Sequence, residues 1–269
     1  FLRYAPAANA NGVAAASFTF QVQDDGGTLN AGVDLDASAN TITIDVTSVN
    51  DEPSGTDKTI TTLEDMPYTF TVADFGLTDG LDSPANNLLA VRITTLPVSG
   101  TLTLAAGASA PGAVAAGQFV SAADIPFLTF TPDANANGAA YAGFTFQVQD
   151  DGGTADAGVD FDATPNTIII DVTSVNDAPA GADKTVTTLE DTAYSFTAAD
   201  FGFSDASDSP ANTLLAVRIT TLPAAGTLTL AAGASAPGAV AAGQFVSAAD
   251  LAFLRYAPAA NANGVAAAS

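Results

Sequence analysis

Residues 168–177 read Ile-Ile-Ile-Asp-Val-Thr-Ser-Val-Asn-Asp, a β-branched run that ends in an Asn-Asp pair. The last seven of these residues also occur at 45–51, so the two copies are offset by 126 positions. The offset holds without insertion or deletion, and 69 of the 93 positions in 51–143 match 177–269. A chain that copies one unit so closely is expected to be a tandem array.

The offset divides the chain into three predicted parts. Residues 1–50 are the C-terminal part of one unit, 51–176 form a complete unit, and 177–269 are the N-terminal part of the next. A complete unit has the size of an ordinary domain and can bury its own core, unlike a solenoid repeat of about 20–50 residues. Because the first residue is not Met and lies inside a unit, we expect a segment of something longer. Each incomplete part would then lack half of its fold unless the chain continues or a neighbouring copy completes it.

The composition is strongly acidic, with 29 Asp and Glu residues against 6 Lys and Arg residues and a net charge of −23. This charge repels phosphate backbones and anionic lipid surfaces, so nucleic acid and membrane surfaces are unsuitable partners. Only 13% of the residues are charged, so the imbalance reflects few cations and suits solubility and cation binding. The chain has no Cys or His, which excludes Cys and His nucleophiles and zinc sites built from them in this segment.

Short stretches of alternating apolar and polar residues, separated by Gly, Pro, Asn and Asp clusters, recur through the complete unit. They predict strands at 58–63, 68–72, 88–96, 101–104, 118–120, 127–130, 144–149 and 167–173. One short helical turn is expected at 121–124. Seven or eight such strands, rich in Thr, Val, Ile and Phe, indicate an all-β fold of the Greek-key β-sandwich type. The uncharged stretch 93–123 is rich in Thr, Ser, Gly and Pro, so we expect β-structure there rather than a membrane-spanning helix.

The junctions between units carry the strongest chemical signal. Val-Asn-Asp-Glu-Pro at 49–53 and Val-Asn-Asp-Ala-Pro at 175–179 each follow the last strand of a unit. They resemble the linker of cadherin domains, where an Asn-Asp pair before Pro supplies oxygen ligands to calcium. Residues 146–153 resemble the penultimate cadherin strand with its Asp-Gly turn, and residues 204–212 resemble the cadherin loop that bears two aspartates.

A closer likeness covers the whole unit. Residues 188–192, residues 199–205 and the Asp-Asp-Gly-Gly turn at 150–153 resemble the cadherin-like (VCBS-type) tandem repeats of giant bacterial adhesins, which are usually exported by type I secretion. The resemblance implies an extracellular, calcium-stiffened stalk at a cell surface or in a biofilm matrix. The chain departs from cadherins near 128–132, where the cadherin Asp and Glu pattern has no counterpart. Fewer ligands imply fewer or weaker sites, toward about 10⁻⁴–10⁻³ M.

Calcium takes about six to eight oxygen ligands, and no single loop of the unit offers that many. The end of one β-sandwich, the linker and the facing end of the next β-sandwich can combine their ligands. At the 50/51 junction the candidate ligands are Asn50, Asp51, Asp79, Asp82 and Asp150. At the 176/177 junction they are Glu64, Asp65, Asn176, Asp177, Asp205 and Asp208.

The same acids have simpler interpretations. Asp and Asn are common turn formers, and Asp-Asp-Gly-Gly alone is a hairpin loop. Glu64 and Asp65 can merely cap a turn. Isolated carboxylates are expected to be solvated hairpin residues, namely Asp34, Asp36, Asp160 and Asp162. Paired carboxylates can also cut a glycosidic bond, but these acids recur at unit borders in each copy, so we do not expect an enzyme.

The sequence therefore predicts a structural function, in which repeats act as spacers of an adhesin stalk or extracellular filament and neighbouring repeats are the partners. The alternative is a carbohydrate- or protein-binding adhesive module. Against it, the five Tyr residues are scattered and form no aromatic cluster. A third arrangement is strand addition between copies, in which residues 1–50 of one copy complete residues 177–252 of another. A continuous chain is the simpler expectation.

Overall fold

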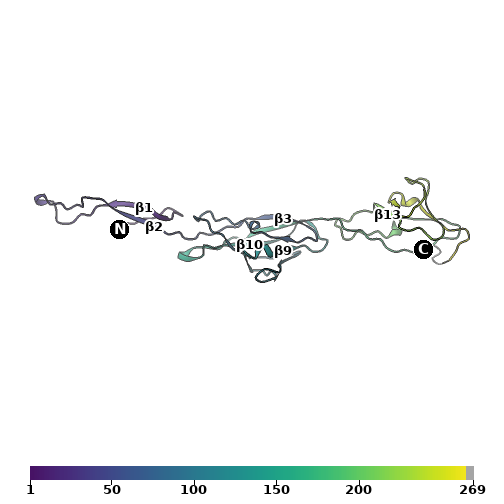
Figure 1. Ribbon diagram of the computed structural model, residues 1–269, viewed down its shortest axis with the longest axis horizontal. Helices are drawn as coiled ribbons and strands as arrows, with labels where there is room; N and C mark the ends of the chain where they lie inside the picture. The colour runs from purple at the N-terminus through teal and green to yellow at the C-terminus, as the bar shows by residue number, and fades with distance from the viewer. Residues whose placement is uncertain (265–269) are drawn as a thin grey trace. The chain divides into compact units, whose positions relative to one another are not determined.

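The structure is a computed structural model that describes residues 1–264 as strands joined by loops and single 3₁₀ turns (Figure 1). The protein is all-β, as the alternating sequence predicts. It divides into two compact units, Phe1–Thr173 and Ser174–Ser269. Within the described residues, no helix has the length and apolar character needed to cross a membrane.

The complete repeat in the first unit contains a five-stranded sheet. In spatial order its strands are β3 (Lys58–Leu63), β11 (Asn166–Thr173), β10 (Gly138–Asp150), β5 (Leu88–Ile93) and β8 (Phe119–Ser121). β3 runs parallel to β11, and the other neighbours are antiparallel. The hairpin β10–β11, which is last in the sequence of the repeat, therefore occupies the middle of the sheet.

A second, four-stranded sheet completes the repeat. Its strands are β4 (Tyr68–Thr69), β9 (Leu128–Thr131), β6 (Thr101–Leu104) and β7 (Gly112–Ala113). Three 3₁₀ turns connect the strands, namely η2 (Val72–Asp74), η3 (Ile125–Phe127) and η4 (Ala155–Ala157). Residues of both sheets belong to one buried core, an arrangement consistent with a β-sandwich.

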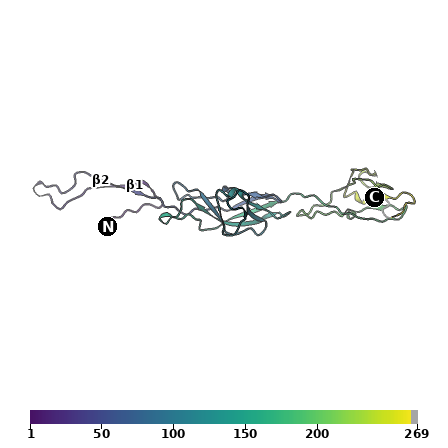
Figure 2. The same cartoon turned by 60° about the horizontal axis from the view of Figure 1, so that its bottom comes forward.

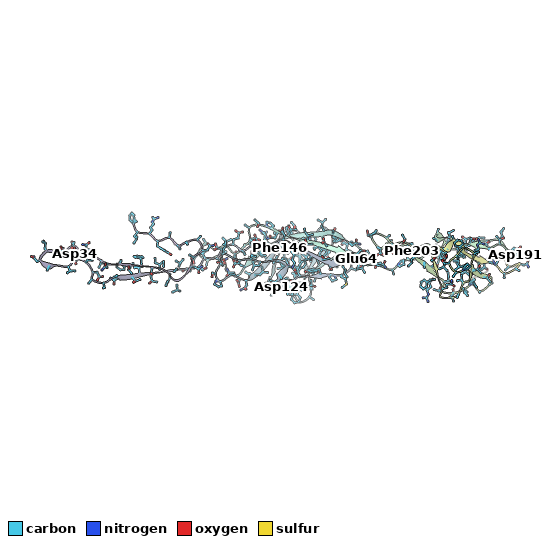
Figure 3. The ribbon with its side chains drawn as sticks, turned by 90° about the horizontal axis from the view of Figure 1, so that it is seen from above. Asp34, Glu64, Asp124, Phe146, Asp191 and Phe203 are labelled. Carbon is cyan, nitrogen blue, oxygen red and sulfur yellow. The ribbon has the colours of Figure 1, made fainter. Side chains whose placement is uncertain are left out.

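Aromatic side chains of the hairpin form the centre of this core. Phe144 and Phe146 lie two residues apart on β10, so the alternation of a strand turns both to the same face. Phe144 contacts Phe70 edge to face at 5.6 Å between ring centroids. Phe146, which Figure 3 labels, contacts Phe75 at 5.0 Å between ring centroids. All four rings are at most 1% exposed, and burying each contributes about 1.5–3 kcal/mol.

An ion pair ties β3 to turn η2. Lys58 Nζ lies 2.6 Å from Asp74 Oδ1, and Thr71 donates its backbone N–H to Asp74 Oδ2 at 2.7 Å. Burial pushes the pKa of Asp74 upward, but the hydrogen bonds from Lys58 and Thr71 bring it below its ordinary value. Lys184 and Asp200 repeat the pair at 2.6 Å in the second unit, where the hydrogen bond from Lys184 lowers the pKa of Asp200 to about 2.

The N-terminal part of the first unit contains a second copy of the hairpin. β1 (Gly12–Phe20) and β2 (Asn40–Val46) run side by side as a two-stranded ribbon, with η1 (Leu29–Ala31) in the connection (Figures 1 and 2). Their pairing register and bulge match those of β10–β11 position for position. The environment differs, because Phe20 is 36% exposed whereas its equivalent Phe146 is 0% exposed.

The second unit contains the four-stranded sheet but only a fragment of the five-stranded one. Its four strands are β12 (Tyr194–Ser195), β17 (Leu254–Ala257), β14 (Thr227–Leu230) and β15 (Gly238–Ala239), with turns η5 (Ala198–Phe201) and η6 (Leu251–Phe253). β13 (Ala216–Arg218) and β16 (Phe245–Ser247) form a separate two-stranded sheet. Residues 184–189, which are equivalent to β3, form no strand among the described residues.

The predicted strands occur in the complete repeat, with differences at their ends. β3 and β6 have the predicted bounds. β4 stops at Thr69 because Thr71 caps turn η2, and β5 stops at Ile93, short of the predicted position 96. β10 is longer than predicted because its N-terminal half pairs with β11 through a bulge. The helical turn predicted at 121–124 lies at η3 instead, with Asp124 as the residue that precedes it.

The lowered pKa of Asp200 predicts a loss of stability in acid. A carboxylate whose pKa is lower in the folded state stabilises the fold above its unfolded pKa, here near 3.8, and that stabilisation is lost as the pH falls through the folded value of about 2. We expect Asp200→Asn to lower the melting temperature at pH 7 in calorimetry, and the deficit to shrink between about pH 4 and pH 2. An equal deficit at both ends of this range would show that the carboxylate charge is not the cause.

Candidate metal centre

Asn50 joins the start of the complete repeat to the hairpin β10–β11. Its Nδ2 donates to Asp150 Oδ1 at 3.1 Å and to the Val159 carbonyl at 2.7 Å. Asp150 ends β10 and accepts the Gly152 N–H at 2.9 Å within the Asp-Asp-Gly-Gly turn. A Cβ at Gly152 would collide with the Asn50 side chain, so glycine is required for this close approach.

The loop that follows turn η2 carries two more predicted ligands. Asp79 Oδ2 accepts the Asn86 backbone N–H at 2.5 Å, and Asp82 Oδ2 accepts the Asp51 N–H at 2.9 Å. The side-chain amide of Asn86 also donates to Asn50 Oδ1. The structure therefore gathers all five residues predicted for the 50/51 junction at one end of the complete repeat.

Two of these carboxylates are buried without a cation beside them. Asp79 is 7% exposed and Asp150 is 0% exposed, and Asp79 Oδ1 has no hydrogen-bond partner among residues 1–264. Burial raises the pKa of Asp79, the hydrogen bond from Asn86 opposes that shift, and the charge of Asp82 adds to it. Burial also raises the pKa of Asp150, and the charges of Asp79 and Asp160 add to that rise against two hydrogen bonds. Both ion pairs found in residues 1–264 lie elsewhere.

This arrangement has the chemistry of a site for a hard divalent cation. Buried carboxylates that repel one another are costly unless a cation compensates them or they bind protons. The available donors are carboxylate and amide oxygens, which suit calcium or magnesium better than a transition metal. The unpartnered oxygen of Asp79 is a ready ligand, and the oxygens of Asp82 and Asp150 can supplement it.

The second unit contains the equivalent contacts between residues 176–177 and the loop at 205–212. Asp208 Oδ1 accepts the Asp177 N–H at 3.1 Å, and Asp205 Oδ2 accepts the Asn212 N–H at 2.5 Å. Asn212 Nδ2 donates to Asn176 Oδ1 at 2.7 Å. Asp205 and Asp208 are each 7% exposed. Residues 176–177 and the loop at 205–212 thus adopt this arrangement with no hairpin equivalent to β10–β11 among the described residues.

Glu64 and Asp65 lie at the other end of the complete repeat. Glu64, which Figure 3 labels, directly follows β3. Its N–H donates to the carbonyl of Thr173, the last residue of β11, at 2.9 Å. Glu64 Oε2 accepts the Asn137 side-chain amide at 2.9 Å, and Asp65 Oδ1 accepts the Asn135 N–H at 3.1 Å. Asp65 has a positive φ of 59°, so it also serves as a turn residue. These contacts show a turn-forming role for both acids within the first unit.

One expectation about the isolated carboxylates is wrong. Asp162 is 1% exposed rather than solvated. Its Oδ2 accepts the Gly55 N–H at 3.0 Å and the Asn166 side-chain amide at 2.8 Å, and its Oδ1 accepts the Thr164 N–H at 2.9 Å. Burial is possible because these three donors satisfy the carboxylate.

Asn86 is the residue of this site that the sequence interpretation missed. Asn86 contacts both Asp79 and Asn50, and Asn212 makes the equivalent contacts with Asp205 and Asn176. Asn86 and Asn212 are 126 positions apart, so the repeat of this residue in both units was the available signal. A plain Asn in a loop rich in Ser, Pro and Ala gave no other indication of its role.

Comparisons with protein-family models, with curated protein sequences and with solved structures find no match for this chain. The chemistry of the site must therefore be judged from its own residues.

The raised pKa of Asp79 predicts that its charge destabilises the metal-free fold. Asp79→Asn removes the charge and keeps an oxygen that can accept the Asn86 N–H. We therefore expect this variant to melt at a higher temperature than the unsubstituted chain in calorimetry, in excess chelator at pH 7.

Asp151→Asn is the matched control. Asp151 is exposed, and the hydrogen bond from the Asn87 backbone N–H lowers its pKa, so removing its charge should give no gain. A lower melting temperature for Asp79→Asn in chelator would contradict the electrostatic interpretation of the site.

Proposed function

We propose that this chain is a structural repeat segment of an extracellular adhesin stalk or surface filament, stiffened by calcium where its repeats join. The observation that carries the proposal is the gathering of Asp79, Asp82 and Asp150 around Asn50 and Asp51. Asp79 and Asp150 are buried, and within the described part of the chain neither is paired with a cationic side chain. A cation that binds there acts on the segment through which the chain enters a repeat.

The finer fold belongs to the same proposal. The repeats are cadherin-like Greek-key β-sandwiches, an interpretation supported by two sheets around one core and by the Asn-Asp-Glu-Pro linker before β3. The chain still departs from the cadherin pattern of Asp and Glu near 128–132, since no acidic residue lies within that stretch. The site therefore has fewer acidic ligands than a full cadherin junction.

Calcium fits the site better than magnesium. Calcium accepts irregular sets of carboxylate and amide oxygens, whereas magnesium demands near-octahedral geometry and gives up water reluctantly. The ligands here come from three separate segments, namely the linker at 50–51, the loop at 79–86 and the end of β10. Such a set of ligands adapts more easily to calcium than to magnesium. We expect a calcium Kd of about 10⁻⁴–10⁻³ M, the range of extracellular calcium-binding modules.

The contacts of the linker explain how a cation would stiffen the junction. The Asn50 side chain is held by Asp150 and Val159, and the Asp51 N–H is held by Asp82. A cation bound to these carboxylates would fix the linker against the repeat that follows and remove the repulsion between Asp79 and Asp82. A chain without cysteine has no disulfide with which to do this.

Calcium should raise the thermal stability of the protein. A site with a Kd of about 10⁻³ M stabilises the folded state by about 1.4 kcal/mol at 10 mM calcium, which corresponds to about 3–6 °C. We expect this rise in calorimetry relative to excess EDTA, and a smaller rise with magnesium at the same concentration.

Asp150→Asn should remove most of the calcium-dependent rise, whereas Asp156→Asn should keep it because Asp156 is an exposed residue of turn η4 in the same connection. Calcium should also slow proteolysis within residues 174–179 and 49–53. Identical melting and cleavage in calcium and in EDTA would rule out the calcium part of the proposal.

A further inference from the structure

A five-residue motif recurs in all three parts of the chain. Ala-Asn-Ala-Asn-Gly occurs at 8–12, 134–138 and 260–264, so it shares the 126-residue offset of the repeat. In the complete repeat its glycine, Gly138, is the first residue of β10. Asn137 is the one asparagine among residues 51–176 that a glycine follows.

The backbone of the motif has the same conformation in every copy. The φ angle is 149° at Gly138, 136° at Gly12 and 135° at Gly264, a region that residues with a Cβ rarely adopt. At Gly138 this conformation starts β10 opposite Val172, just before the bulge. The fold therefore requires a glycine directly after Asn137.

The side chain of Asn137 links the start of β10 to the end of β3. Its Nδ2 donates to Glu64 Oε2 at 2.9 Å, and Glu64 is 2% exposed. The contact recurs between Asn263 and Glu190 at 3.3 Å. Because a buried carboxylate needs hydrogen-bond donors, an amide side chain is favoured at position 137 for a local structural reason.

These two requirements place a chemically reactive pair at the start of β10. Asparagine is among the thermolabile residues, and glycine has no side chain to hinder its own backbone nitrogen. The Gly138 nitrogen loses its proton and bonds to Asn137 Cγ, while the Cγ–Nδ2 bond breaks and Nδ2 leaves as ammonia. Water then opens the five-membered imide at either carbonyl and leaves aspartate or isoaspartate. Water is the only other reactant.

Asn137 is less restrained than two other amides of the first unit. It is partly exposed, and Glu64 is the one partner of its side chain in the described part of the chain. Asn50 and Asn166, by contrast, each donate to two residues. Only one side-chain contact must therefore open before Asn137 Cγ can approach the Gly138 nitrogen.

We infer that Asn137 is a site of spontaneous deamidation in the folded protein, which replaces the amide partner of Glu64 with a second carboxylate. Asn11 and Asn263 carry the same site in the other two parts of the chain. The aspartate product has no N–H to donate to Glu64, and the two carboxylates repel each other. Isoaspartate also lengthens the backbone by one carbon where β10 begins. Each repeat therefore loosens at this end as the protein ages.

Peptide mapping by mass spectrometry tests the site in the 269-residue chain, incubated in EDTA at pH 7 and at pH 8. The peptide that contains Asn135 and Asn137 should gain the mass of one amide-to-acid conversion, and its fragment ions should place that conversion at Asn137. The conversion should be faster at pH 8, because the attacking nitrogen must lose its proton. Part of the product should be isoaspartate, because the imide opens at either carbonyl.

Two controls belong to this measurement. Asn135 is an internal control, because it lies in the same loop and is followed by Ala136 rather than by glycine. Asn137→Gln keeps an amide but would need a six-membered ring, so it should show no conversion over the same time. Conversion at Asn137 no greater than at Asn135 would overturn the inference. A product of aspartate without isoaspartate would overturn the imide route.

The effect on stability has a separate test in calorimetry at pH 7. Asn137→Asp reproduces the aspartate product and should lower the melting temperature in EDTA, because Glu64 loses a donor and gains a like charge. In a Glu64→Gln background the same change should lower it less, because amide and carboxylate have exchanged places and can again form a hydrogen bond. Equal losses in the two backgrounds would overturn the assigned effect on Glu64. Because each experiment is done in EDTA, its failure is separate from a failure of the calcium proposal.

Discussion

The fold of each repeat depends on the pairing of one hairpin between two strands that precede it in the sequence. β10–β11 lies between β3 and β5, and its Phe144 and Phe146 close the core against Phe70 and Phe75. The described part of the second unit contains no equivalent hairpin, and there β13 has one strand neighbour and residues 184–189 form no strand. The four-stranded sheet, by contrast, forms in both units. The repeat therefore consists of a self-sufficient sheet and one that needs its last two strands.

The same hairpin links the core to the candidate metal centre. Asp150 is the last residue of β10, so seating the aromatic face of that strand also places this carboxylate beside Asn50. The linker residues Asn50 and Asp51 contact groups at the end of the repeat that follows them. Completion of the sheet and assembly of the candidate metal centre thus depend on the same strand, β10.

Much of the fold was predictable because its determinants are local. Alternation predicted β3 and β6 to the residue, and Thr71 accounts for the early end of β4 through a cap that strand alternation does not reveal. The central position of β10–β11 was not predictable, because sheet order depends on contacts between distant segments and leaves no periodic signal. The repeat offset is informative in another way, since it identifies 1–50 and 177–269 as complementary parts of one unit from their residues alone.

The candidate site was predictable in composition but not in burial. The five residues assigned to the 50/51 junction do meet at one end of the repeat, whereas Asn86 had no motif to mark it and Asp162 is a buried structural acid. Sequence spacing identifies acids in loops. It does not tell an acid satisfied by three donors, such as Asp162, from one with an unpartnered oxygen, such as Asp79.

Amide hydrogen exchange tests the role of the hairpin most directly, because one chain carries both states of the repeat. In this chain, residues 58–63 and 88–93 should be protected from exchange, while residues 184–189 and 216–219 should exchange rapidly. Equal protection of the two sets of residues would contradict the account.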